Sequence, residues 1–107
     1  MKSEERKRAD LFKALADENR LRILRMLQKG ERCACELLDE LQIGQSTLSH
    51  HMKILCDSEL VEDRKQGRWI YYSISEEKAE QFKEMVGSML IVTPIDHTEN
   101  QKRCCGE

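Results

Sequence analysis

The stretch from Gly44 to Leu55, Gly-Gln-Ser-Thr-Leu-Ser-His-His-Met-Lys-Ile-Leu, decides the fold that we expect for this chain. Leu48, Met52 and Leu55 recur at spacings of four and three, which places them on one face of a helix that can dock on a core. The other face has no carboxylate and carries short polar or basic side chains, namely Gln45, Ser46, Thr47, Ser49, His50 and Lys53. Such groups suit base edges and phosphates, so the stretch is typical of a helix that lies against DNA.

A second short helix is predicted directly before this one, over residues 33–41. Ala34, Leu37, Leu38 and Leu41 lie there at positions i, i+3, i+4 and i+7, which gives one buried stripe. Gly44 lies in the break between the two helices. Two short helices joined by a tight, glycine-containing turn predict a helix-turn-helix unit in which the second helix reads the DNA bases.

Two strand-like runs follow, at residues 60–64 and 68–74, with Lys65-Gln66-Gly67 between them. This pattern predicts a β-hairpin, and a hairpin directly after a DNA-reading helix is the wing of a winged helix. Its basic side chains would then lie near a phosphate or the minor groove; they are Arg64, Lys65 and Arg68. The alternative is a surface hairpin with ordinary solvated charges.

Three further helices complete the prediction, over residues 3–16, 18–29 and 76–90. In the second of them Leu21, Leu24 and Leu27 are expected to point inward. The basic side chains of this helix would then form an outer face that is either solvated or directed at phosphates. They are Arg20, Arg22, Arg25 and Lys29. The expected fold is mainly α with a small hairpin, an α+β winged helix-turn-helix of order ααααββα within residues 1–95. Residues 96–107 are expected to form a polar, mobile tail.

Length and charge agree with one small DNA-binding domain. The chain has 107 residues and a net charge of −2, but residues 1–30 hold nine Lys or Arg against five Asp or Glu. An acidic total therefore does not exclude a nucleic-acid partner. The N-terminus is charged, and the longest apolar run, residues 85–92, is too short to span a bilayer. We expect a cytoplasmic protein with no membrane partner.

Four motifs occur in order along the chain: ALADENRLRIL at residues 14–24, CACEL at 33–37, QSTLSHHMKIL at 45–55 and GRWIYY at 67–72. Together they resemble the ArsR/SmtB family of metal-sensing repressors. The resemblance implies a homodimer that binds an inverted-repeat operator in double-stranded DNA and leaves it when a metal or metalloid binds. It also implies a dimer interface from the first and last helices. The implied groove contacts are Ser46, Thr47, Ser49 and His50, with Gln45 and Lys53 at phosphates.

Cys33 and Cys35 are the candidate ligands for the ion. Five cysteines in a reducing compartment favour metal or thiol chemistry over a disulfide framework. Thiolates suit As(III), Sb(III), Cd(II), Pb(II), Zn(II) and Cu(I). The alternative is a pair of small buried hydrophobic residues. The position of the pair resembles that in the arsenic, antimony, cadmium and lead sensors of the family. The lack of an N-terminal cysteine favours As(III) or Sb(III) as the inducer.

The sequence does not identify the third thiol ligand that As(III) would need. Leu38 occupies the position where some relatives place a third cysteine, so the candidates are a small external thiol, Cys56, Cys104 and Cys105. The vicinal pair Cys104-Cys105 could also form a separate site. The predicted last helix contains no His or Asp, so the zinc, cobalt and nickel site of the family is not expected. His50 and His51 are expected to face DNA or the surface.

The spacing of Cys33 and Cys35 suggests how sensing could work. Residues i and i+2 of an α-helix point roughly 200° apart, so both sulfurs would reach one ion only if the first turn of the 33–41 helix opened. That helix supports the reading helix. Ion binding and the DNA-fitting geometry would then exclude each other, which is the coupling that a derepressor needs.

Other functions remain open from the sequence alone. The same thiols could sense Cd(II), Pb(II) or an oxidant within the same family. A thiol enzyme is less favoured, because no Cys-x-x-Cys lies beside a βαβ pattern and no Cys/His/Asn set suggests a nucleophile. We therefore predict that the chain is not an enzyme. A winged helix used for protein contact would show no salt-dependent DNA affinity.

Overall fold

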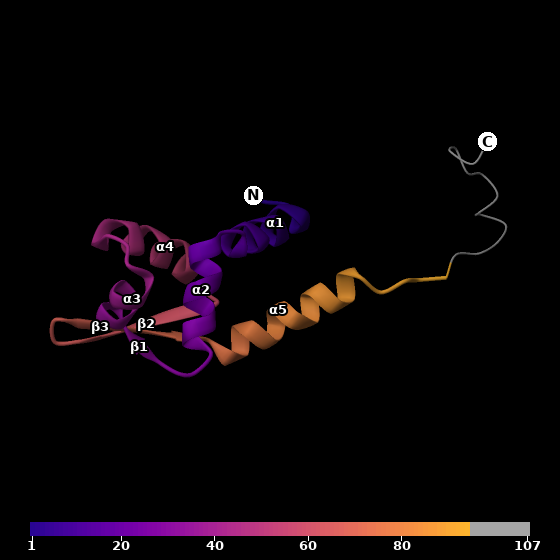
Figure 1. The fold of residues 1–107 in the computed structure, drawn as a ribbon. Coiled ribbons are helices and arrows are strands. Elements are labelled where there is room, and N and C mark those ends of the chain that lie inside the picture. The colour runs from indigo at the N-terminus through magenta and orange to yellow at the C-terminus, as the bar shows by residue number, and fades with distance from the viewer. Residues whose placement is uncertain (95–107) are drawn as a thin grey trace.

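The computed structural model describes residues 1–94 and has the expected α+β winged-helix architecture (Figure 1). Its elements are α1 (Glu4–Leu15), α2 (Glu18–Leu27), β1 (Arg32–Cys33), α3 (Ala34–Leu41), α4 (Gln45–Asp57), β2 (Val61–Gln66), β3 (Trp69–Ile74) and α5 (Glu76–Met89). The predicted fold class is confirmed. The predicted order lacked only β1. The proposed tail, residues 96–107, lies outside the described residues.

Helices α1, α2 and α5 begin where a short polar side chain accepts free N–H groups of the first turn. The side chain of Ser3 accepts the backbone N–H of Arg6 at the start of α1. Asp17 does the same for α2, since its Oδ2 accepts the N–H groups of Asn19 and Arg20 at 2.9 and 3.2 Å. Such caps define the start of a helix in sequence and direct the chain into the next packing layer.

The core forms where α2, α3 and α4 meet the sheet. Its fully buried side chains come from all of these elements: Ile23, Leu37, Met52, Leu55 and Val61. The apolar stripe predicted for the reading helix is confirmed, because Leu48, Met52 and Leu55 are all buried. The prediction for Leu21 was wrong, because its side chain is 53 % exposed. Leu27 is buried as predicted, and Ile23 and Met26 complete the buried face of α2.

The three strands form one antiparallel sheet in the order β1-β3-β2. The wing is the β2–β3 hairpin, with pairs that run from Val61↔Ile74 to Gln66↔Trp69. The short strand β1 adds to the other edge of β3, through the pairs Arg32↔Tyr72 and Cys33↔Tyr71. A two-residue strand has no alternation to detect, so the sequence pattern could not predict it. Its consequence is that Cys33 is joined to the wing.

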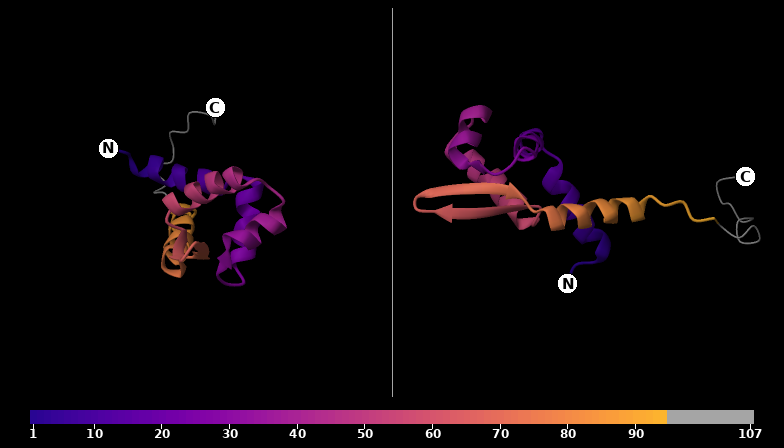
Figure 2. Two further views of the ribbon diagram at one scale, coloured as in Figure 1. Left: turned by 90° about the vertical axis from the view of Figure 1, so that its left-hand side faces the viewer. Right: turned by 90° about the horizontal axis from the view of Figure 1, so that it is seen from below.

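Helices α1 and α5 lie away from the wing, and α5 and the hairpin extend in opposite directions (Figures 1 and 2). The rings of Phe12 and Phe82 join the two helices edge to face, with centroids 5.5 Å apart. No residue of α5 is buried, and the apolar side chains of Met89 and Leu90 are 43 % and 73 % exposed. Within residues 1–94, no helix is long and apolar enough to cross a membrane.

Candidate DNA interface and cysteine site

Helix α4 is presented by a tight turn from α3. Gln42 follows the last residue of α3 in the left-handed conformation, with φ of 56°, and Gly44 directly precedes α4. With Leu48, Met52 and Leu55 packed on the core, the opposite face of α4 is directed to solvent. All six residues predicted to contact DNA from this helix are exposed: Gln45, Ser46, Thr47, Ser49, His50 and Lys53. The only charged pair that they make within the described residues joins Lys53 to Asp57 at 3.3 Å.

The three basic side chains of the wing differ in how freely they can move. Arg64 is held by Glu31, with Nε–Oε2 and Nη2–Oε1 distances of 3.0 and 2.8 Å. Its guanidinium also lies 4.7 Å from the ring centroid of Tyr71. Lys65 and Arg68 are exposed and take part in no ion pair within residues 1–94. These two side chains are therefore the ones that can turn toward a phosphate without breaking an existing contact.

The contact between Arg64 and Glu31 is charge-assisted at both oxygens. The hydrogen bond from Arg64 lowers the pKa of Glu31 below its usual value, and the same contact raises the pKa of Arg64. Glu31 comes two residues before Cys33 in the chain. The pair therefore ties the wing to the segment that leads into the cysteine site.

The two sulfurs of the cysteine pair lie together. Cys33 precedes α3 with extended backbone angles, φ −71° and ψ 146°, and Cys35 is in the first turn of that helix. The Cys35 thiol donates to Sγ of Cys33 at 2.6 Å, and the backbone N–H of Cys35 donates to the same sulfur at 3.3 Å. The expected separation of roughly 200° was wrong, because it assumed that both residues were helical. The helix does not need to open for both sulfurs to face one ion.

Cys33 is held in place by a capping box. The carboxylate of Glu36 accepts the backbone N–H of Cys33 at 2.9 Å, while the sulfur of Cys33 accepts in the first turn of α3. Cys33 is 7 % exposed and Cys35 is exposed, so solvent reaches the pair through Cys35. The hydrogen bond with Cys33 raises the pKa of the Cys35 thiol. A thiophilic ion would have to displace the protons of both thiols in order to bind.

The other candidate ligands are not gathered around this pair. Burial raises the pKa of the half-buried Cys56 thiol to about 11, which disfavours the thiolate that binds an ion. Cys104 and Cys105 lie outside the described residues. Within the part of the chain that the structure describes, no group of three or more His, Cys, Asp or Glu residues is placed to hold a metal ion. The described site is thus a dithiol.

His51 and Arg20 differ from their predictions. His51 is buried at 7 % exposure rather than facing DNA or the surface, whereas its neighbour His50 is exposed. Arg20 turns inward and approaches Nδ1 of His51 at 3.1 Å, rather than standing outside α2. Spacing along α4 could have revealed the burial, because His51 is three residues after Leu48 and four before Leu55.

Comparison with known proteins places this chain in one class of regulator. Residues 17–63 match the family described as bacterial regulatory protein, arsR family. The chain is 42% identical over 74 residues to the arsenical resistance operon repressor of Bacillus subtilis (strain 168), which covers 68% of this chain and 70% of that protein. The chain belongs to the ArsR family of bacterial regulatory proteins. Membership of a family of regulators agrees with the prediction that it is not an enzyme.

Two relatives from Staphylococcus aureus differ in the resistance that their names state. The arsenical resistance operon repressor is 51% identical over 65 residues, covering 61% of this chain and 62% of that protein. The cadmium resistance transcriptional regulatory protein CadC homolog is 35% identical over 77 residues, covering 71% and 64%. The chain therefore spans slightly less than two thirds of either relative. A solved ArsR family transcriptional regulator has the same fold, with a TM-score of 0.71, 25% identity and coverage of 83% and 92%.

Proposed function

We propose that this protein is a cytoplasmic transcriptional repressor that binds operator DNA as a homodimer and is released when As(III) or Sb(III) binds the thiolates of Cys33 and Cys35. The observation that carries the proposal is the pair of sulfurs 2.6 Å apart at the start of α3. The same helix leads through a tight turn into α4, whose exposed face suits DNA.

The chemistry of α4 and the wing supports operator binding. The exposed face of α4 combines amide, hydroxyl, imidazole and ammonium groups, which can contact base edges and phosphates in the major groove. Lys65 and Arg68 add two exposed positive charges at the wing, where a phosphate or the minor groove would lie. The acidic excess of the whole chain does not oppose this, because affinity depends on the charge near the DNA.

The exposed apolar side chains of α1 and α5 support a homodimer. Phe12, which contacts Phe82 of α5, is 38 % exposed, and Leu90 at the end of α5 is 73 % exposed. A second copy could cover these side chains and would place two α4 helices on one duplex, which is how a two-fold dimer reads an inverted repeat.

The dithiol supports a soft, thiophilic inducer. As(III) and Sb(III) form stable bonds to sulfur, and in a dimer the remaining ligand could come from Cys104, Cys105 or a small external thiol. Cys56 is disfavoured as that ligand because its thiol is half-buried and hard to ionise. Cys35 gives the ion access from solvent, and Cys33 would connect the ion to the protein interior.

The contacts of Cys33 suggest how ion binding would change the DNA-binding surface. When its sulfur bonds to an ion, Cys33 would no longer accept the N–H of Cys35 that caps α3. Cys33 also pairs with Tyr71 of the wing strand β3, so a movement of its backbone would be passed to the wing as well as to α3 and α4. Ion binding and a DNA-fitting geometry would then oppose each other, which is a coupling free energy between two sites.

The proposal is tested by operator binding with Cys33→Ser and Cys104→Ser, each titrated with arsenite. We expect wild-type protein to leave the DNA and Cys33→Ser to stay bound. An unchanged response in Cys104→Ser would place the whole sensor beside α3, whereas a lost response would place the third ligand in the tail. Release of Cys33→Ser by arsenite at the wild-type concentration would contradict the proposal.

A second candidate is a Cd(II), Pb(II) or thiol-redox sensor that uses the same two cysteines. The similarity to a cadmium resistance regulator favours the metal version, and the 2.6 Å separation of the sulfurs favours the redox version. Titrating the DNA complex separately with arsenite, antimonite, Cd(II), Pb(II) and hydrogen peroxide would distinguish these sensors, because each predicts release at the lowest concentration of a different reagent.

A further inference from the structure

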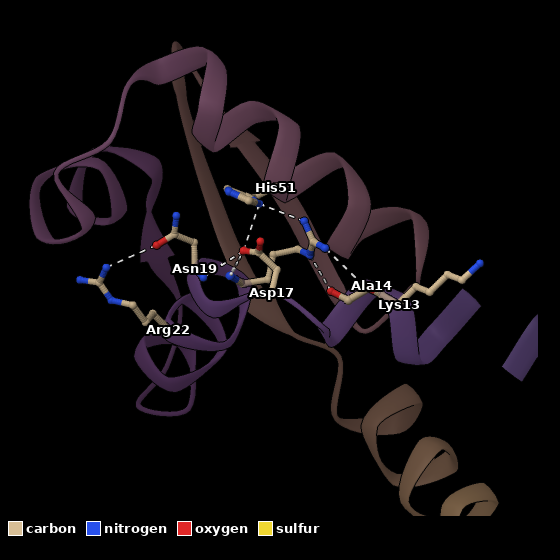
Figure 3. A network of polar contacts seen from close by, with 7 residues as sticks. Lys13, Ala14, Asp17, Asn19, Arg22 and His51 are labelled. Atoms are coloured by element: carbon tan, nitrogen blue, oxygen red, sulfur yellow. Dashed lines mark hydrogen bonds and ion pairs between the residues drawn. The ribbon is translucent and has the colours of Figure 1, made fainter. Parts of the chain in front are cut away.

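A polar network at the junction of α1, α2 and α4 takes no part in the proposed DNA contacts or in the cysteine site. Arg20 of α2 is its centre, and Figure 3 shows its partners Lys13, Ala14 and His51. Its Nε donates to the carbonyl of Ala14 at 2.8 Å and its Nη2 to the carbonyl of Lys13 at 3.3 Å. These carbonyls lie in the last turn of α1, where a positive charge also suits the helix dipole.

The remaining nitrogen of Arg20 reaches the DNA-reading helix. Its Nη1 lies 3.1 Å from Nδ1 of His51 in α4. A guanidinium can only donate, so Nδ1 accepts and the imidazole is neutral with its proton on Nε2. One side chain from α2 therefore connects the end of α1 to the buried face of α4.

The charges around the His51 ring decide what happens when it gains a proton. Oδ2 of Asp17 lies 3.7 Å from Nδ1, and Arg20 and His50 are the cationic or ionisable neighbours from α2 and α4. From α1, the Lys13 side chain runs away from the ring, as Figure 3 shows. Burial lowers the pKa of His51, and the nearby carboxylate of Asp17 opposes this effect. His51 is therefore neutral at neutral pH and gains its proton in acid.

Protonation would exchange the partners of His51. An imidazolium has no lone pair on Nδ1 with which to accept from Arg20, and two cations at this distance repel. Asp17 stays ionised in mild acid, because the backbone N–H of Arg20 lowers the pKa of its carboxyl group. The new N–H of His51 would then turn toward Asp17, and α4 would lose its connection through Arg20 to the end of α1.

We propose that Arg20 and His51 are positioning residues that hold α4 against the end of α1, and that protonation of His51 releases this contact and weakens DNA binding. The inference rests on the proposed operator binding. The direction of the change in DNA affinity is diagnostic. A protein that gains positive charge in acid should bind phosphates more tightly, so weaker binding in acid needs a specific cause.

The test measures operator affinity at about pH 7.5 and at an acid pH at which the NMR signal of the His51 ring shows that the ring is protonated, with salt held constant. The probe is a labelled duplex that the full-length wild-type protein selects from a random-sequence pool. We expect the wild-type dissociation constant to rise about fivefold to tenfold in acid, the net effect of losing one typical intramolecular hydrogen bond. His51→Asn should abolish this change, because its amide oxygen takes the place of Nδ1 and does not titrate.

The matched control is His50→Asn, the same substitution at the adjacent, exposed histidine. It should keep the acid-dependent weakening, whatever its affinity at neutral pH. Arg20→Lys should also remove the pH dependence, because an ammonium group cannot reach both the α1 carbonyls and the His51 ring. The connection between α1 and α4 would then be absent at every pH. Melting temperatures at both pH values establish that each variant is folded under the conditions of the measurement.

A readout without DNA separates this inference from the proposed function. The His51 ring signal and the backbone amide signals of α4 are followed by NMR as the pH falls. We expect the α4 signals to shift with the His51 titration in wild type and to stay fixed in His51→Asn. If no duplex is selected but these shifts occur, the proposal of operator binding is contradicted, whereas the proposed release of α4 on protonation of His51 is supported. Fixed α4 signals in wild type, or equal acid weakening in His51→Asn and wild type, would overturn the inference.

Discussion

Cys33 lies one position before α3 rather than within it, and this position decides where its sulfur points. With extended backbone angles, φ −71° and ψ 146°, the sulfur turns back over the first turn and meets Cys35 at 2.6 Å. A helical Cys33 would direct its sulfur to the far side. The residue that begins the helix thus also creates the dithiol.

The thiols of the chain should differ strongly in reactivity. Cys35 is exposed, whereas Cys56 is half-buried and has a pKa of about 11. At about pH 8, iodoacetamide should therefore modify Cys35 well before Cys56, because Cys35 is open to the reagent while Cys56 is half-buried and its thiolate, the reactive form, is scarce. Peptide mass spectrometry after timed labelling measures both rates, with labelling in urea as the control for full access. Equal rates in the folded protein would contradict the placement of Cys56.

At the scale of the elements, α4 has two faces with different tasks. Its apolar side chains dock on the core and its polar side chains face solvent. The fully buried Leu55 makes the docked face essential for stability, and Leu21, the α2 residue that sequence placed inward, offers a comparison with the same substitution.

Leu55→Ala should lower the free energy of unfolding by about 2–5 kcal/mol, because it leaves a cavity in the core. Leu21→Ala should change it by less than about 0.5 kcal/mol, because that side chain is largely in solvent. Urea denaturation followed by circular dichroism measures both. A loss at Leu21 as large as that at Leu55 would show that the buried face of α2 has been assigned incorrectly.

The wing should contribute unequally to DNA binding. Lys65→Ala and Arg68→Ala should each reduce the slope of log affinity against log salt by about 1, the value for one phosphate contact. Arg64→Ala should reduce it less, because Arg64 is already paired with Glu31. Fluorescence anisotropy at several salt concentrations gives the slopes. The reverse order, with the largest change at Arg64, would mean that its pair with Glu31 breaks on DNA.

The features that were predictable from sequence are those in which a hydrophobic pattern extends over several residues. The features that were missed depend on the conformation of a single residue. The periodic stripe of α4, the hairpin and the fold class were predictable because many side chains repeat the same signal. The strand β1 was not predictable, because a strand of two residues shows no alternation of apolar and polar side chains. That omission put Cys33 inside a helix and separated sulfurs that lie together. The inward turn of Arg20 depends on the helix-end carbonyls of α1, which no local pattern in α2 encodes.

At the scale of the whole molecule, α1 and α5 leave apolar side chains uncovered at the side away from the wing. Leu90→Asp should therefore shift the protein from dimer to monomer and weaken operator binding, because a buried charge would oppose association. Gln81→Asp, at an exposed polar position of α5, is the matched control and should remain dimeric. Sedimentation equilibrium measures the assembly. A Leu90→Asp dimer as stable as wild type would exclude this face as the interface.

In the proposed mechanism, a soft ion at the dithiol and DNA on α4 oppose each other. The most direct measurement is the operator dissociation constant of wild-type protein without arsenite and with arsenite bound at one equivalent per Cys33–Cys35 pair. We predict that the constant rises about fivefold to 150-fold when arsenite is bound, the usual range of coupling between two sites. Equal constants, with the arsenic still bound to protein in the DNA complex, would show that the two sites are not coupled.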